Sequence, residues 1–286
     1  MSLENFAIFI LTHGRADNVI TVQTLKRCGY TGRYYIVIDD EDDQEDQYRK
    51  NFGDLVIQFN KTEAAKTFDP MDLSEDRRTI VYARNACFGI ARNLGVRYFL
   101  ELDDDYRSFE MRWVDGQKLM VKSVPNMDAV CEAMVDFLKA TQADTVAMAQ
   151  GGDFIGGANG GAYKKHVMRK TMNSFFCDAE KPFTFIGRIN EDVNTYVRAA
   201  ITGRKMFTVT DVSLTQEKTQ SNKGGMSDVY LDMGTYLKSF YTVMVAPSCV
   251  KVQMMGDKHK RIHHQIKWRN CAPMILNERW KKSSDE

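Results

Sequence analysis

Three consecutive carboxylates, Asp103, Asp104 and Asp105, directly follow the apolar run Tyr98–Leu102. If that run is a buried strand, it delivers them to the carboxyl end of a sheet, where open α/β sheets bind ligands. Alternate residues leaving a strand point to the same side, so we expect Asp103 and Asp105 to converge on one cation. Carboxylate oxygens suit Mg²⁺ or Mn²⁺, which also hold phosphate oxygens. Taken alone, such a motif is more often a solvated acidic turn.

Two other segments carry residue types that could do chemistry. Glu191 and Asp192 follow a Gly187-Arg188 turn and open a predicted helix, whose positive end acids favour. The segment Gly151–Gly161 holds six glycines but matches neither spacing of the known phosphate-binding glycine loops. The glycine-rich segment therefore reads either as a flexible connector or as a border of the ligand site.

The elements that must position these residues read as an α/β fold in the first half of the chain. Unbroken apolar runs predict strands buried on both faces of a parallel sheet, with helical crossovers between them. A long helix is expected over Ser74–Leu94, with Ser74 as its N-cap. From Asp42 onward we expect only a charged loop and the start of a helix. The other expected elements are strands Phe6–Leu11, Tyr34–Ile38, Leu55–Phe59 and Tyr98–Leu102, and helices Asn18–Cys28 and Gln44–Phe52.

The second half is less regular. Asp115-Gly116 between Arg107–Val114 and Lys118–Val124 is a strong hairpin signal. Residues 1–286 are interpreted as one domain, with a front half 1–125 that carries the candidate metal site and a rear half 126–286 with a basic tail. The other expected elements are helices Met127–Ala140, Glu191–Ile201 and Val229–Val245, a strand Thr145–Ala149, and a polar loop Ser221–Ser227.

The composition is that of a globular chain able to bury a core, with 43% hydrophobic and 27% charged residues over 286 positions. Residues 251–282 carry nine Lys or Arg against two acids, which suits a solvated face or a phosphate-docking surface. The six scattered cysteines form no CxxC pair, which favours a cytoplasmic protein over a disulfide or zinc scaffold. No run approaches the roughly 20 apolar residues that span a bilayer, so no membrane partner is expected.

Four motifs in order resemble GT-A glycosyltransferases: Thr12-His13-Gly14-Arg15, Asp39-Asp40, Ala83-Arg84-Asn85 and Asp103-Asp104-Asp105. The chain looks more closely like the TET-associated glycosyltransferase family of bacteriophages, with a likeness extending to the tail segment Arg261–Trp268. The resemblance implies a Rossmann-like GT-A fold, with a mostly parallel central sheet flanked by helices. It also implies sugar transfer from a nucleotide donor to 5-hydroxymethylpyrimidine in DNA, 5-hydroxymethylcytosine above all.

The same resemblance implies a donor site for a UDP-sugar, UDP-glucose or UDP-N-acetylglucosamine, in the front half. The loop after the first strand would line the nucleotide pocket, and Asp39 or Asp40 would accept hydrogen bonds from ribose or base. Arg84 would bind diphosphate through its guanidinium fork, or else form a salt bridge on the helix surface. Asp103 and Asp105 would hold Mn²⁺ or Mg²⁺. The implied donor-binding residues are Thr12, His13, Arg15, Asp39, Asp40, Arg84, Asn85, Asp103 and Asp104.

In the rear half the resemblance implies the general base and a further metal ligand. Asp192, with Glu191 second, would remove the proton of the acceptor hydroxyl, which is a poor nucleophile until it is deprotonated. A tail histidine would complete the metal shell. His263 and His264 are adjacent, so in a strand they would face opposite ways and only one would reach the ion. His259 is a third candidate.

The acceptor is the part of the implied reaction that the sequence constrains least. A basic tail with Trp268 and Trp280 suits a nucleic acid through phosphate contacts and base stacking. The same enzyme class could instead act on a glycan, protein or small molecule. A nucleotidyltransferase also uses paired carboxylates and metal, but Thr12–Arg15 is not its glycine-rich phosphate loop. A non-catalytic nucleic-acid-binding module would leave the carboxylates without a role.

Overall fold

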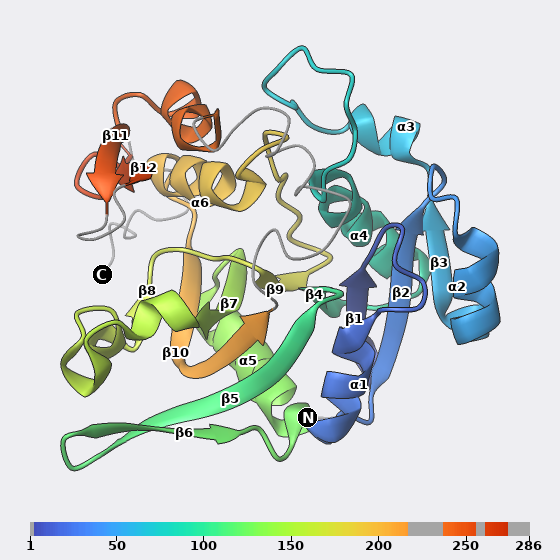
Figure 1. Cartoon of the computed structure of the whole chain (residues 1–286), viewed down its shortest axis with the longest axis horizontal. Coiled ribbons are helices and arrows are strands. Elements are labelled where there is room, and N and C mark those ends of the chain that lie inside the picture. Colours follow the sequence, from blue (N-terminus) through green and yellow to red (C-terminus); the bar gives the residue numbers. More distant parts are fainter. Residues whose placement is uncertain (1–2, 217–236, 256–260, 274–286) are drawn as a thin grey trace, which may run out of the picture.

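The structure, a computed structural model, describes residues 3–216, 237–255 and 261–273, and a ten-stranded sheet forms its centre (Figure 1). The strand order is β3-β2-β1-β4-β9-β7-β10-β5-β6, and β8 pairs with β10 beside this path. Strands β3, β2, β1, β4, β7 and β10 run in one direction, while β9 runs antiparallel between β4 and β7. The predicted α/β class with a mostly parallel central sheet flanked by helices is confirmed.

The parallel half of the sheet forms from the apolar runs that the sequence marks. All six residues of β1 are buried, and so is every residue of β4 except the last, Asp103. The register pairs Leu11 with Asp103, so the two strands end at the same level. The four strands are β1 (Phe6–Leu11), β2 (Arg33–Asp39), β3 (Val56–Phe59) and β4 (Tyr98–Asp103).

Helices cover both faces of the sheet, because successive strand residues point to opposite sides. In β1, Phe6, Ile8 and Ile10 belong to one apolar core and Ala7, Phe9 and Leu11 to the other. The first core packs under α1 (Ile20–Arg27), α5 (Met127–Thr141) and Tyr48 of α2 (Glu45–Phe52). The second packs under α3 (Lys61–Ala65), α4 (Val81–Asn93) and α6 (Glu191–Ile201).

The long helix predicted from Ser74 begins only at Val81, so its first turns are wrong. Residues 66–80 form a loop instead. Asp72, Ser74 and Asp76 each accept a hydrogen bond from the backbone N–H two residues later. These local bonds satisfy the backbone without a helix, which is why short polar side chains compete with helical structure.

Several strands of the rear half are absent from the prediction. Strand β9 is short, and its pairing with β4 and β7 is entirely non-local. In β10, Thr208, Thr210 and Ser213 are buried, so the strand lacks the apolar alternation that would mark it. The expected hairpin is confirmed, with Gly116 at φ +59° in its turn. The strands β5 (Tyr106–Asp115), β6 (Lys118–Ser123) and β7 (Thr145–Gln150) are predicted from the sequence, whereas β8 (Val167–Met168), β9 (Ser174–Asp178) and β10 (Met206–Gln216) are not.

Short 3₁₀ turns occupy the glycine-rich segment, which is irregular as predicted. Gly156 and Gly157 there adopt positive φ, +92° and +59°. Asp153 is buried and pairs with Lys170, which anchors the segment to the strand region that follows it. The 3₁₀ turns are η1 (Leu3–Asn5), η2 (Gly53–Leu55), η3 (Gly151–Phe154), η4 (Gly157–Asn159) and η5 (Tyr163–Lys165).

The last described part of the chain packs beside α6 (Figure 1). Residues 237–245 are helical, which confirms the second part of the predicted helix Val229–Val245. A separate two-stranded antiparallel sheet follows, β11 (Val250–Met255) with β12 (Arg261–Ile266). The predicted loop Ser221–Ser227, the residues 229–236, His259 and Trp280 lie outside the described residues.

The described part of the chain contains no disulfide, since all six cysteines are free and buried. This agrees with their scattered spacing. None of the helices that the structure describes combines the length and the apolar character needed to cross a membrane.

Candidate active site

Polar side chains from the ends of β1 and β4 are bonded to one another at the carboxyl edge of the sheet. Thr12 Oγ1 donates to Asp104 Oδ2 at 2.6 Å, and Arg15 Nη1 lies 2.8 Å from Asp104 Oδ1. The hydroxyl of Tyr48 lies 2.8 Å from Thr12 Oγ1 and accepts the backbone N–H of Arg15 at 2.8 Å. Both oxygens of Asp104 are used inside the protein, so the middle acid of the motif fixes the loop after β1.

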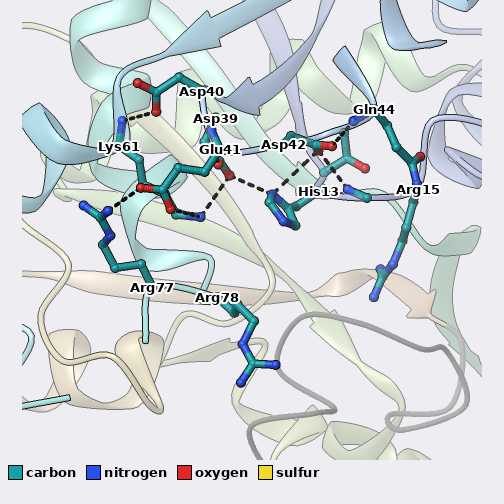
Figure 2. A network of polar contacts seen from close by, with 12 residues as sticks. His13, Arg15, Asp39, Asp40, Glu41, Asp42, Gln44, Lys61, Arg77 and Arg78 are labelled. Atoms are coloured by element: carbon teal, nitrogen blue, oxygen red, sulfur yellow. Dashed lines mark hydrogen bonds and ion pairs between the residues drawn. The ribbon is translucent and has the colours of Figure 1, made fainter. Parts of the chain in front are cut away.

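A second group forms around Asp39 at the end of β2, between His13 and Lys61 (Figure 2). Asp39 Oδ2 lies 2.9 Å from His13 Nδ1 and 3.2 Å from Lys61 Nζ. The hydrogen bond with Asp39 raises the pKa of His13. Burial by itself would raise the pKa of Asp39, but His13 and Lys61 together lower it, so this carboxylate is charged at neutral pH. His13 is 39% exposed and Asp39 7%, so the imidazole is the member open to a ligand.

Two further acids of this loop, Asp42 and Asp40, fix the backbone around it. Asp42 accepts the N–H of Gly14 at 2.8 Å and lies 3.6 Å from His13 Nδ1. Its side chain has no exposed area, although the sequence suggests only a charged loop there. Asp40 accepts the N–H of Lys61 at 2.8 Å and so fixes the start of α3. Asp40 thus has a structural contact beside its predicted contact with a nucleoside.

Arg84 lies among three carboxylates drawn from β4 and α6. Its guanidinium is 3.1 Å from Asp103 Oδ1, 3.2 Å from Glu191 Oε1 and 3.7 Å from Glu101 Oε2. It also lies over the Phe175 ring, 4.7 Å from the centroid. Burial alone would lower the pKa of Arg84, but the three carboxylates raise it, so this side chain is a permanent cation.

The geometry corrects one expectation for the motif around Arg84. The alternative of a helix-surface salt bridge is wrong, because the Arg84 side chain is only 2% exposed. Its predicted contact with a diphosphate stays a prediction. The neighbouring Asn85 accepts the N–H of Phe185 at 2.9 Å and donates to its carbonyl at 3.0 Å. Asn85 therefore fixes the segment that leads into α6.

The two acids predicted as general base begin α6 close to the motif after β4. Both Glu191 and Asp192 are 9% exposed. Burial, followed by the charge of Asp192, raises the pKa of Glu191, and burial also raises that of Asp192. The charge of Asp103 also raises the pKa of both acids. The structure thus brings Glu191 and Asp192 within electrostatic reach of Asp103, 88 or more positions earlier in the sequence.

The predicted metal pair, Asp103 and Asp105, keeps oxygen atoms in a partly accessible position. The Asp103 side chain is 23% exposed. Burial, with the charges of Asp103 and Asp104, raises the pKa of Asp105 to about 7. Within the described residues no group of three or more potential ligands is assembled. Mg²⁺ is commonly held by one or two carboxylates and the substrate's phosphates, so two aspartates fit such an ion.

The predicted tail histidines lie on β12, and their rings touch, with centroids 4.3 Å apart. The expectation that they face opposite ways is wrong. His263 Nδ1 donates to the carbonyl oxygen of His264 at 2.7 Å, which turns its ring back toward its neighbour. Burial, with the charges of His263 and Lys238, lowers the pKa of His264 to about 4. His264 is therefore neutral at pH 7, the form in which imidazole binds metals.

Helix 237–245 forms hydrogen bonds both to this strand and to the residue that precedes α6. The carbonyl of Lys238 accepts a hydrogen bond from Asn190 Nδ2 at 2.7 Å, and Ser239 Oγ donates one to the Ile262 carbonyl at 2.9 Å. The charge of Lys238 also lowers the pKa of both Asp192 and His264. Trp268 is engaged inside the protein, because its ring stacks on Tyr196, with centroids 5.8 Å apart, and the Arg169 guanidinium lies 5.5 Å from its centroid.

Three site residues are absent from the sequence-based candidates. Glu101 is the easiest to justify afterwards, since a fully buried acid inside the apolar run of β4 is rare without a partner. Lys61 and Tyr48 carry no such signal. Their roles depend on contacts with Asp39 and Thr12, which are set by packing between distant segments.

Solved structures with some likeness to this chain include three proteins. The mannosyltransferase PcManGT from Pyrobaculum calidifontis, in complex with GDP-Man and Mn²⁺, is 12% identical with TM-score 0.47, covering 85% of this chain and 73% of that chain. Glucosyl-3-phosphoglycerate synthase from Mycobacterium tuberculosis, with Mg²⁺ and UDP, is 9% identical with TM-score 0.42, at 92% and 87% coverage. S. aureus TarS 1-349 is 12% identical with TM-score 0.41, and this chain covers only 59% of it, with 73% of this chain matched.

Family membership is decided by sequence. A comparison with curated proteins found no match. The family profile of the TET-Associated Glycosyltransferases matches residues 6–225, which include both strand-end groups, Arg84 and the start of α6. That range covers well over half of the chain, so this protein belongs to the TET-associated glycosyltransferase family.

Proposed function

We propose that this glycosyltransferase is of the GT-A type and moves a sugar from a UDP-sugar to the hydroxyl of 5-hydroxymethylpyrimidine in DNA. The observation that carries the proposal is the contact of Arg84 with Asp103 and Glu191. In this proposal Asp103 would serve the metal-bound diphosphate, and Glu191 belongs to the pair of acids that would deprotonate the acceptor. The resemblance to phage proteins supports the DNA acceptor and a location in the host cytoplasm.

On the donor side, His13 and Asp39 would contact the nucleoside, with UDP-glucose or UDP-N-acetylglucosamine as the donor. Asp103 and Asp105 would hold Mn²⁺ or Mg²⁺, with His264 as the tail ligand. A divalent ion bound there offsets negative charge on the departing diphosphate. The Thr12–Asp104–Arg15 contacts keep the loop after β1 fixed against β4, so the donor meets a preformed surface.

On the acceptor side, we assign the general base to Asp192, with Glu191 as the alternative. A base works best when its pKa lies near the working pH, and burial raises the pKa of both acids toward neutrality. Glu191 Oε1 is already 3.2 Å from Arg84 Nε. The Asp192 side chain accepts the neighbouring N–H of Val193 at 2.7 Å. It is the acid better placed to accept the acceptor's proton.

A transfer assay tests the proposal. The full chain is incubated with radiolabelled UDP-glucose or UDP-N-acetylglucosamine, Mn²⁺ and DNA that is either hydroxymethylated or plain. We expect label only in hydroxymethylated DNA. Label entering glycans, proteins or small hydroxyl compounds instead would keep the enzyme class and overturn the DNA acceptor.

The Asp192→Asn variant separates the base from the donor site. It should bind donor normally and lose transfer by about 100-fold or more, the usual contribution of a general base. Equal loss of donor binding and transfer would place the base elsewhere. No donor turnover with any acceptor would refute the enzymatic reading.

A further inference from the structure

The β5–β6 hairpin gathers exposed apolar side chains at the edge of the molecule. Five of the eleven large apolar residues that are exposed in the described part of the chain lie on it. The hairpin extends as a long arm along the lower side of the view in Figure 1, and β6 is the last strand of the sheet order. Its five exposed apolar residues are Met111, Trp113, Val114, Met120 and Val121.

The strand register divides these residues between two faces. Trp113 pairs with Met120, and the flanking pairs on the same face are Met111 with Lys122 and Asp115 with Lys118. The indole is 41% exposed and Met120 36%, and both lysines are exposed. This face therefore presents one flat aromatic ring. Each of the two flanking residue pairs contributes one lysine ammonium group. We call this surface the Trp113 face.

Part of the opposite face of the hairpin packs on the protein itself, although Val114 and Val121 on that face are exposed. Leu119 joins a small cluster with Phe154 and Tyr163, and the guanidinium of Arg112 lies 3.9 Å from the Phe154 ring centroid. Arg112 is also paired with Glu110 at 2.7 Å. The hairpin is thus supported from behind. This support holds the Trp113 face in one orientation.

We propose that the Trp113 face binds an unpaired stretch of the nucleic-acid acceptor, which deepens the proposed function and rests on its DNA acceptor. Bases stack on exposed aromatic rings, and phosphates seek lysine beside them. The two exposed lysines supply the charge complementary to a polyanion. A duplex hides the faces of its bases in the stack, so this flat platform suits a single strand. Trp268, by contrast, is already covered by Tyr196.

The hairpin is also connected directly to the candidate metal motif. Strand β5 begins at Tyr106, immediately after Asp105, and Trp113 lies eight residues beyond Asp105 on the same continuous chain. At about 3.3 Å per residue this is a span of about 26 Å. A strand held on the Trp113 face would therefore be tethered a few nucleotides away from the reacting base, which would raise the local concentration of the acceptor.

Direct binding of a fluorescein-labelled oligothymidylate of about 12 nucleotides, followed by fluorescence anisotropy, tests the inference on the full chain. Trp113→Ala should weaken binding about tenfold, whereas Trp113→Phe should keep most of the affinity, since it keeps a stacking ring. Lys118→Ala and Lys122→Ala should each lower the slope of log affinity against log salt by about 0.7. Val114→Ala, on the other face of the same hairpin, should change nothing and serves as the matched control.

The outcomes separate this inference from the proposed function. Donor hydrolysis without acceptor should be equal in wild type and Trp113→Ala, which shows an intact enzyme. Transfer to DNA that is unaffected by Trp113→Ala, or an oligonucleotide affinity equal in both proteins, overturns the inference and leaves the proposed function standing. Absence of any oligonucleotide binding by the wild type, a preference for duplex, or a change only in self-association measured by light scattering, also overturns it. If DNA is bound through Trp113 but never glycosylated, the proposed acceptor chemistry fails instead.

Discussion

Arg84 is the residue on which the charge balance of the site depends. It is buried with Glu101, Asp103 and Glu191 around it, and two of these acids are candidates for metal binding and proton transfer. Burial raises the pKa of Glu101 to about 8, so near neutral pH this acid is largely protonated and adds little charge. Arg84 is therefore left to hold Asp103 and Glu191 together. We interpret it as a positioning residue.

Replacement of this cation should destabilise the whole protein. Arg84→Met leaves buried carboxylates without their partner, and such losses cost about 3–5 kcal/mol. Urea unfolding followed by circular dichroism measures the change. Asp103→Asn placed in the same chain should recover part of the loss, because it removes one of the carboxylates that Arg84 contacts.

The matched control is the same substitution at an exposed ion pair. Arg49 lies 2.7 Å from Glu45 on α2, with 46% of its side chain exposed. Arg49→Met should change the unfolding free energy by less than about 1 kcal/mol. Equal effects of Arg84→Met and Arg49→Met would contradict the positioning role of Arg84.

Ionisation of the acids at the start of α6 should govern the acid limb of the pH–rate profile. A general base is active only when ionised, and burial raises the pKa of Asp192 above its ordinary value. Turnover should therefore fall at a higher pH than the value near 4 that is typical of an exposed carboxyl. The Lys238 charge lowers the pKa of Asp192, so Lys238→Ala should move this limb to still higher pH. Initial rates across pH 4–9 measure both effects.

Lys251→Ala provides the control, since Lys251 is an exposed residue of β11. Its profile should overlay that of the wild type. An acid limb that stays in place in Lys238→Ala contradicts the assignment of Asp192 as base.

At the scale of elements, the entry of α6 depends on a close approach at Gly187. Its φ is +82°, and a Cβ there would lie 2.4 Å from Asn194 Nδ2 and 3.1 Å from Tyr241 Cε1. Gly187→Ala should lower the unfolding free energy by about 2–4 kcal/mol, through backbone strain and overpacking. Turnover should fall as well, because Asn190 and the two acids after it follow this turn. Thermal unfolding and initial rates of the purified variant measure the two effects.

Gly89→Ala is the comparison within a helix. Gly89 lies in α4, and a Cβ there would meet no atom within 4 Å beyond the backbone of its own helix. It should be neutral or stabilising by up to about 1 kcal/mol, because alanine favours the helix. A Gly187→Ala variant as stable and active as Gly89→Ala would show that the turn tolerates a side chain.

The elements that could be predicted are those whose own residues carry the signal. The buried parts of β1, β2 and β4 are apolar apart from Asp39 and Glu101, and α6 begins and ends where the acids and Gly203 predict. The start of α4 could not be predicted, because a correct reading requires the side-chain bonds of Asp72 and its neighbours. Strand β10 is hidden for another reason: buried threonines mimic the pattern of an exposed loop.

The same limit applies to the candidate site. The family motifs led to Asp103, Arg84 and Glu191 as separate candidates, yet their mutual contact depends on how α4 and α6 pack on the sheet. The partner of Asp39, Lys61, belongs to α3, a short helix without a sequence signal of function. The candidate residues could therefore be predicted from the sequence, whereas the contacts between them could be seen only in the fold.

For the whole molecule, the two halves of the sequence interleave in one sheet. Strands β4 and β5 are joined by only Asp104 and Asp105, yet β9, β7 and β10 lie between them in the sheet order. After the acidic motif the chain enters β5, which pairs with β10 rather than with β4. Helix 237–245 then connects α6 to β12. A ligand at the motif therefore contacts the point where front and rear halves meet.

Such a location predicts that donor and metal stabilise the molecule together. Ligand present at 100 times its dissociation constant adds about 2.7 kcal/mol to the unfolding free energy. For a chain of this size that corresponds to a rise in Tm of about 4–5 °C. UDP with Mn²⁺ should produce this rise in differential scanning fluorimetry, and UDP in the presence of EDTA should produce much less. Asp103→Ala should lose the metal-dependent part, whereas Asp115→Ala in the exposed hairpin turn should keep it. A full shift in Asp103→Ala, or equal shifts with Mn²⁺ and EDTA, would mean that the diphosphate is held without an ion at the end of β4.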